Sequence, residues 1–146
     1  MKDYKNILTT LTSDEVENIL KALPKGISKD NQIVYVLAVD LFLERNKEET
    51  IQAVYVYDDE RYDPNPDEVC VCFFTDHSYT GKEVIKANEC LIARLYDKME
   101  EAGLNPFDHQ TNFIFLKYPG EKVIETNPTW EWVKATRAIL WTKTKK

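Results

Sequence analysis

Glycine, histidine and cysteine are scarce in this sequence, and their scarcity removes several classes of site. Four glycines among 146 residues leave little room for a phosphate-cradling loop, and no such motif occurs. His77 and His109 each follow an aspartate beside loop-forming residues, and no Gly-x-Ser-x-Gly or His-Glu-x-x-His pattern is present. We therefore predict two solvated loop histidines, no catalytic residue, and a protein that is not an enzyme.

The three cysteines lack the spacing of a metal site. Cys70 and Cys72 lie on one face of the same predicted strand, and Cys90 follows in a predicted helix. With a histidine they would make a zinc site, which is the competing interpretation, but no Cys-x-x-Cys or His-x(3–5)-His pair supports it. We predict buried, hydrophobic cysteines, no metal and no cofactor.

Positive charge is also in deficit. The chain has 19 basic and 25 acidic residues, a formal charge of −6, which argues against nucleic acid or an anionic membrane as a partner. The longest apolar run, residues 33–43, is too short to cross a bilayer and contains Asp40. The polar residues 1–6 lead into no apolar signal region, so we predict a cytoplasmic location.

What the chain does have is enough apolar content for a packed core. Hydrophobic residues make up 43% and aromatic residues 12%, which excludes a disordered chain. With this length and no linker or internal repeat, we predict one domain over residues 1–146.

Capping boxes predict two helices. In a capping box, the side chains of a threonine and of a glutamate three residues later each accept a hydrogen bond from the backbone N–H of the other residue. Thr80 and Glu83 begin a long helix within residues 79–104, which Gly103 ends in the left-handed conformation. Its apolar stripe consists of Val84, Asn88, Leu91, Ile92, Leu95, Met99 and Ala102. Thr12 and Glu15 begin a shorter helix that ends before Pro24.

The remaining apolar segments favour strands. Residues 33–44 are β-branched and aromatic and are apolar on both faces, which favours a central strand; a helix over 38–49 is the alternative. Residues 51–58, 69–75 and 111–118 alternate as further strands, and residues 122–126 complete a hairpin with the last of them. Asn127 favours a C-terminal helix, with a strand over 138–142 as the competing interpretation.

The predicted fold class is therefore α+β: an antiparallel sheet, made of a meander plus a hairpin, packs against the one long helix. Flanking helices lie at the N-terminus and, in one interpretation, at the C-terminus. Asp40 interrupts the most apolar segment and needs a partner there, such as Arg94 or a tyrosine hydroxyl. Asn88 is predicted to be a hydrogen-bonded core amide. Both are interpreted as structural residues.

Acidic residues concentrate between the second and third predicted strands. Residues 58–68 hold six acids and one arginine, a local charge of −5. One interpretation is a solvated turn that keeps the sheet edge soluble. The other is a partner-binding surface that imitates phosphates, with Tyr55, Tyr57 and Tyr62 as aromatic anchors. The candidate partner-binding residues are Asp58, Asp59, Glu60, Tyr62, Asp63, Asp67 and Glu68.

The order of these segments resembles the YezG-like immunity proteins of bacterial polymorphic toxin systems. The resemblance is carried by Leu23-Pro24, Val34-Tyr35-Val36, Asn105-Pro106-Phe107, Phe113-Ile114-Phe115 and the terminal Arg137-Ala138-Ile139-Leu140-Trp141. The family usually has Pro-Trp-Thr where this chain has Pro106-Phe107-Asp108. The resemblance implies binding to a nuclease toxin without catalysis, and a strand rather than a helix over 138–141.

Two functions from different classes follow. In the first, the chain is an immunity protein that binds a basic cognate toxin, a nuclease on the resemblance, through the acidic surface. In the alternative, it binds or processes a small ligand or nucleotide in a pocket between the sheet and the long helix, with Asp40, His77 and Cys90 as polar groups. The oligomeric state is left open.

Overall fold

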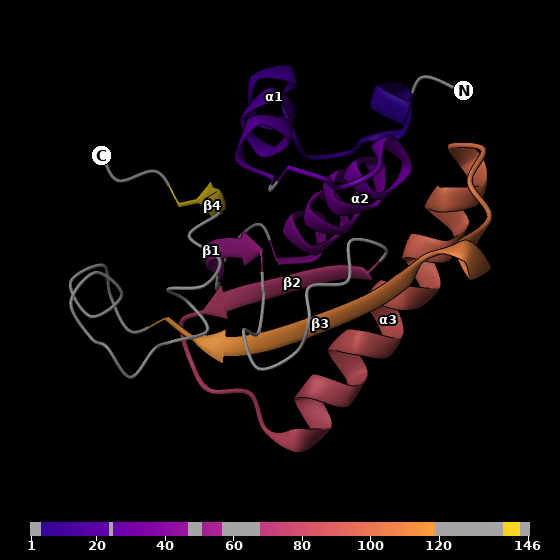
Figure 1. The fold of residues 1–146 in the computed structure, drawn as a ribbon. Helices are drawn as coiled ribbons and strands as arrows, with labels where there is room; N and C mark the ends of the chain where they lie inside the picture. The colour runs from indigo at the N-terminus through magenta and orange to yellow at the C-terminus, as the bar shows by residue number, and fades with distance from the viewer. Residues whose placement is uncertain (1–3, 24, 47–50, 57–67, 119–138, 144–146) are drawn as a thin grey trace.

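A computed structural model describes residues 4–23, 25–46, 51–56, 68–118 and 139–143 (Figure 1). Helices and a four-stranded mixed sheet pack on one another, which confirms the α+β class. In chain order the elements are η1 (Tyr4–Ile7), α1 (Ser13–Ala22), α2 (Lys29–Asn46), β1 (Ile51–Val56), β2 (Glu68–Thr75), α3 (Gly81–Glu101), η2 (Pro106–Asp108), β3 (Gln110–Lys117) and β4 (Ile139–Thr142).

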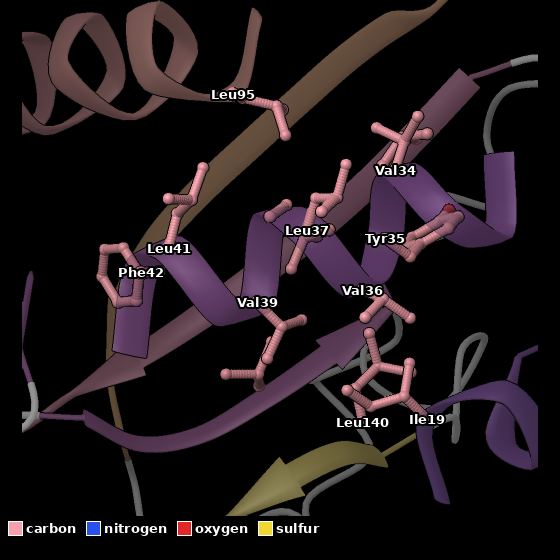
Figure 2. Close-up of a cluster of buried hydrophobic side chains, with 14 of the residues drawn as sticks. Ile19, Val34, Tyr35, Val36, Leu37, Val39, Leu41, Phe42, Leu95 and Leu140 are labelled. Carbon is pink, nitrogen blue, oxygen red and sulfur yellow. The ribbon is translucent and has the colours of Figure 1, made fainter. Parts of the chain in front are cut away.

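Helix α2 corrects the prediction of a strand over residues 33–44. Every residue from 33 to 43 is buried, because α2 lies between the sheet, α1 and α3, and side chains leave it in all directions (Figure 2). A helix covered on all sides needs apolar residues around its whole circumference. A strand buried on both faces has the same apolar pattern, and the β-branched residues of this segment led to the incorrect prediction of a strand.

No helix of the described residues, α2 included, has both the length and the apolarity to span a membrane.

The start of α2 carries a signal that the strand prediction overlooked. The Ser28 hydroxyl accepts a hydrogen bond from the Asn31 N–H at 3.1 Å, as an N-cap serine does. Asp30 lies in the first turn, where the helix dipole favours an acid. These residues begin the helix before the apolar run, whose 11 residues from 33 to 43 exceed most strands.

The sheet has the strand order β3-β2-β1-β4. Strand β1 is antiparallel to both neighbours, as predicted for the hairpin of β1 and β2. Strand β3, in contrast, pairs parallel to β2, so the prediction of a wholly antiparallel sheet is wrong at this pair. The reason is the connection: α3 returns the chain to the start of β2, and strand–helix–strand units give parallel neighbours.

Both capped helices are confirmed. The hydroxyls of Thr12 and Thr80 accept from the N–H groups of Glu15 and Glu83, each at 3.2 Å, and the glutamates bond back. Gly103 ends α3 with φ of 84°. Its N–H bonds the Glu100 carbonyl, and the Leu104 N–H bonds that of Met99 at 2.8 Å, which together form a Schellman motif.

The two faces of the sheet belong to different apolar clusters. Val71 and Phe73 of β2 and Phe115 of β3 face the helices and join the main core. Cys72 and Phe74 lie on the opposite face, in a second cluster. This alternation follows from the two-residue period of a strand.

The C-terminal described segment is a strand. Ile139–Thr142 form β4, which pairs antiparallel with β1, so the helix interpretation is wrong for these residues. The Trp141 indole N–H donates to Glu15 Oε2 at 2.7 Å and ties β4 to α1. The predicted hairpin strand 122–126 and the start of the C-terminal helix at Asn127 lie outside the described residues.

Candidate functional site

The predicted partner-binding segment connects two central strands. Asp58, Asp59, Glu60, Tyr62, Asp63 and Asp67 lie outside the described residues. Glu68 is the first residue of β2 and is half-buried. Because Val56 pairs with Val71 in the antiparallel register, the segment joins strands whose positions are fixed by the core.

Tyr55 does not belong to the candidate surface. Its side chain is 6% exposed and packs edge-on against Phe74, with ring centroids 5.3 Å apart. The prediction that Tyr55 is an aromatic anchor for a partner is therefore wrong, because it faces the second apolar cluster. Tyr57 and Tyr62 lie outside the described residues.

Asp40 is buried and fully engaged in structure. Its Oδ1 accepts from the N–H groups of Thr10 and Leu11, both at 2.8 Å, and its Oδ2 accepts from the Thr9 N–H at 2.9 Å. The Thr9 hydroxyl also donates to Oδ2 at 3.2 Å. The predicted partner Arg94 is wrong: Arg94 bonds Glu44 at 2.7 Å. Asp40 is thus not a polar group of a ligand site.

A cavity of about 250 Å³ lies between α2 and α3, beside Tyr79. Its apolar wall is formed by Leu41, Phe42 and Leu91, and its rim carries Glu83, Lys86, Cys90 and Arg94. This is not the predicted ligand pocket between the sheet and the long helix, because two helices form it, and Asp40 is absent from its lining. Its volume falls below the range of about 300–1,000 Å³ usual for ligand sites.

The cysteines occupy three different environments. Cys72 is fully buried in the second apolar cluster, and this burial raises the pKa of its thiol far above the usual range. Such a thiol stays protonated and unreactive. Cys70 and Cys90 are half-buried. Among the described residues, no three His, Cys, Asp or Glu side chains are grouped as metal ligands.

His109 makes a side-chain contact that the sequence did not predict. His109 is half-buried, and its Nδ1 lies 2.6 Å from Oδ1 of the buried Asn31 on α2. This contact holds the end of η2 against α2, so the prediction of a solvated loop residue is wrong for His109. The prediction that Asn88 is a core amide is also wrong, because Asn88 is half-exposed beside a surface groove.

His77 joins the end of β2 to the first turn of α3. Its Nδ1 lies 2.7 Å from Asp76 Oδ1 and its Nε2 lies 3.3 Å from Glu83 Oε2. The hydrogen bonds to Asp76 and then to Glu83 raise the pKa of His77 above its usual value. The Thr80 N–H and then His77 lower the pKa of Glu83. Since the His77 side chain is half-exposed, solvent weakens both contacts.

We expect the contribution of His77 to stability to fall as the pH rises. Its pKa is raised in the folded state, so the contribution is complete below the unfolded value of about 6.5. It is lost as the pH rises through the folded value. The difference in unfolding free energy between wild type and His77→Gln should be larger at about pH 6 than at about pH 9. Urea unfolding at both pH values measures it; an equal difference would contradict the assignment.

A groove between α3 and β3 lies where the alternative interpretation placed its ligand pocket, between the long helix and the sheet, but none of Asp40, His77 and Cys90 lines it. Its volume is about 580 Å³, and Ile92, Ala93, Tyr96 and Phe113 form its apolar lining. At one end the ring of Phe107, which is 84% exposed, meets Tyr96 edge-on with centroids 6.1 Å apart. The sequence shows an aromatic residue after Asn105-Pro106, but whether its side chain is exposed depends on tertiary packing.

Comparison of the chain with protein-family models, with curated proteins and with solved structures found no match. The resemblance to YezG-like immunity proteins therefore stays a prediction that rests on the residues quoted for it.

Proposed function

We propose that this protein is an immunity protein that binds and inhibits a basic toxin protein, a nuclease on the strength of the family resemblance. The observation that carries the proposal is the concentration of acid in residues 58–68, whose local charge of −5 accounts for most of the chain total of −6. In the chain this segment connects β1 and β2, two strands paired in the core, and a concentration of one sign of charge creates a negative field.

The physical basis is electrostatic steering followed by apolar contact. A nuclease must attract phosphates, so its substrate-binding surface is cationic. An acidic protein surface is attracted to the same region, and this raises the association rate more than the final affinity. Burial of apolar and aromatic side chains then slows dissociation.

The first test is protection and binding. The protein encoded by the reading frame beside this gene, which the proposal expects to be the toxin, is produced with and without the chain, and cell survival and nuclease activity are measured. We expect survival and loss of nuclease activity only when the chain is present. Binding without inhibition, or no binding, would contradict the proposal.

Replacing Asp58, Asp59, Glu60 and Asp63 with serine should slow association roughly tenfold at low ionic strength. The difference should shrink as salt is added, because screening shortens the reach of the field to about 10 Å at 0.1 M. Stopped-flow or surface-based kinetics across a salt series measures both effects.

A matched control separates local charge from net charge. Asp14, Glu17, Asp30 and Asp76 are four exposed acids on α1, on α2 and after β2. Replacing them with serine changes the net charge by the same four units. If both variants associate equally slowly, the effect belongs to net charge and the segment 58–68 has no special role.

The small-ligand alternative has less support. Of its three polar groups, Cys90 lines the cavity between α2 and α3, His77 reaches it only through Glu83, and Asp40 bonds residues 9–11 instead. Within the rim of that cavity, Arg94 is already paired with Glu44. None of the three polar groups lines the groove between α3 and β3, which is the described pocket between the sheet and the long helix.

A further inference from the structure

We infer that the groove between α3 and β3, together with Phe107, is the apolar half of the toxin-binding interface. The inference rests on the proposed function, and it names a surface made only of described residues. Its occupant would be the basic toxin protein, contributing an apolar side chain to the groove beside the Phe107 ring.

The first argument is the exposure of Phe107 itself. A phenylalanine with 84% of its surface in water gains nothing from the hydrophobic effect in the free protein. Aromatic residues, phenylalanine among them, are enriched at protein interfaces relative to the rest of the surface. Ile85, which is 60% exposed, lies two helical turns before Ile92, so apolar exposure continues along the same side of α3.

The second argument is that Phe107 is held in a fixed position. Asn105 Oδ1 accepts from the Phe107 N–H at 3.1 Å, and the Asn105 carbonyl accepts from the Asp108 N–H at 3.0 Å. Pro106 beneath it is buried, and His109 after it bonds Asn31 of α2. A ring presented on a hydrogen-bonded turn loses little conformational entropy on binding.

The third argument is charge. Glu89 is the charged residue that lines the groove. Glu100, one turn after Tyr96, and Asp108, next to Phe107, are both exposed acids. An apolar groove with acids beside it is complementary to a cationic protein surface that carries apolar side chains.

The fourth argument is continuity with the acidic segment. In the parallel register of β2 and β3, Glu68 pairs with Gln110, two residues after Asp108. The segment 58–68 therefore joins the sheet at the same end as η2 (Figure 1). A partner attracted to Glu68, the described acid of that segment, would lie at the end of the sheet where η2 carries Phe107.

The test measures binding of the inactivated toxin domain from the neighbouring reading frame. Phe107→Ser should weaken the affinity about 30-fold, mainly through faster dissociation. Charge reversal of Glu89 and Glu100 to lysine should instead slow association in a salt-dependent way. Melting temperatures should be unchanged for Phe107→Ser, since its side chain makes little buried contact.

Two matched controls lie elsewhere on the molecule. Ile139, which is 46% exposed, is on β4 at the other edge of the described sheet, and Glu17 is an exposed acid on α1. Ile139→Ser and Glu17→Lys should bind as wild type does. Equal losses in the Phe107→Ser and Ile139→Ser variants would overturn the assignment of the surface.

The outcomes separate this inference from the proposed function. If wild type binds the toxin domain and Phe107→Ser binds equally well, the surface is wrong and the function stands. If wild type does not bind the toxin domain, both the proposed function and the assignment of this surface are contradicted. If the chain alone is a dimer that Phe107→Ser dissociates, the occupant is a second copy, and the inference is also overturned.

Discussion

The Asp40→Ala variant is expected to lose about 3 kcal/mol of unfolding free energy. The reason is that the carboxylate, itself 1% exposed, accepts three backbone hydrogen bonds and one hydroxyl bond from residues 9–11. Hydrogen bonds to a charged group contribute more than neutral ones. Residues 9–11 precede Thr12, the N-cap of α1, so the same change loosens the attachment of α1 to α2.

Asp40→Asn serves as the graded comparison. An amide oxygen in place of Oδ1 would keep the bonds from Thr10 and Leu11, while an NH₂ group in place of Oδ2 would face the Thr9 N–H donor. We expect a loss between zero and that of alanine. Urea unfolding of the three proteins gives the order. Equal stability of wild type and Asp40→Ala would show that water replaces the carboxylate without cost.

The residues that begin and end helices gave the most reliable predictions from the sequence. The capping boxes at Thr12 and Thr80 and the left-handed Gly103 are local devices, each satisfied by atoms a few residues away. They need no knowledge of the tertiary structure, and all three are confirmed. The N-cap at Ser28 is of the same kind, and it would have corrected the secondary structure of α2 had it been weighed against strand propensity.

Most of the incorrect predictions concern features that depend on contacts between distant segments. Residues 33–43 are buried on every side, and for such a run neither the three- to four-residue period of a helix nor the alternation of a strand remains visible. The partner of Asp40 lies about 30 residues away in a loop whose backbone amides leave no signature in the side-chain sequence. The parallel pairing of β3, by contrast, was available from the strand–helix–strand order of residues 69–118.

The candidate site divides in the same way. Its charge could be predicted, because six acids in 11 positions are a property of composition. The exposure of Phe107 could not be predicted, because Phe107 and Phe113 are both aromatic residues near predicted elements, and only packing leaves one 84% exposed and the other 5% exposed. Tyr55 shows the converse, since it was predicted to be an anchor and is buried.

The Phe73→Ala variant is expected to lose about 3–5 kcal/mol, the largest effect of any single change considered. Phe73 is fully buried, and its ring stacks on Phe42 of α2 with centroids 4.0 Å apart. It also lies 5.5 Å from the ring of Phe115 and 5.8 Å from that of Phe113. Truncation would leave a cavity at the point where α2 meets the sheet.

Phe107→Ala is the matched control, since it removes the same atoms from an exposed position and should change stability by less than about 0.5 kcal/mol. Because small domains have about 5–15 kcal/mol in total, Phe73→Leu provides a milder variant that keeps the fold. Urea unfolding reports each value. A double-mutant cycle of Phe42→Leu and Phe73→Leu should then show a coupling of about 0.5–1.5 kcal/mol. Independent, additive losses would mean that α2 does not stack on the sheet through these two rings, and the placement of the central helix would have to be revised.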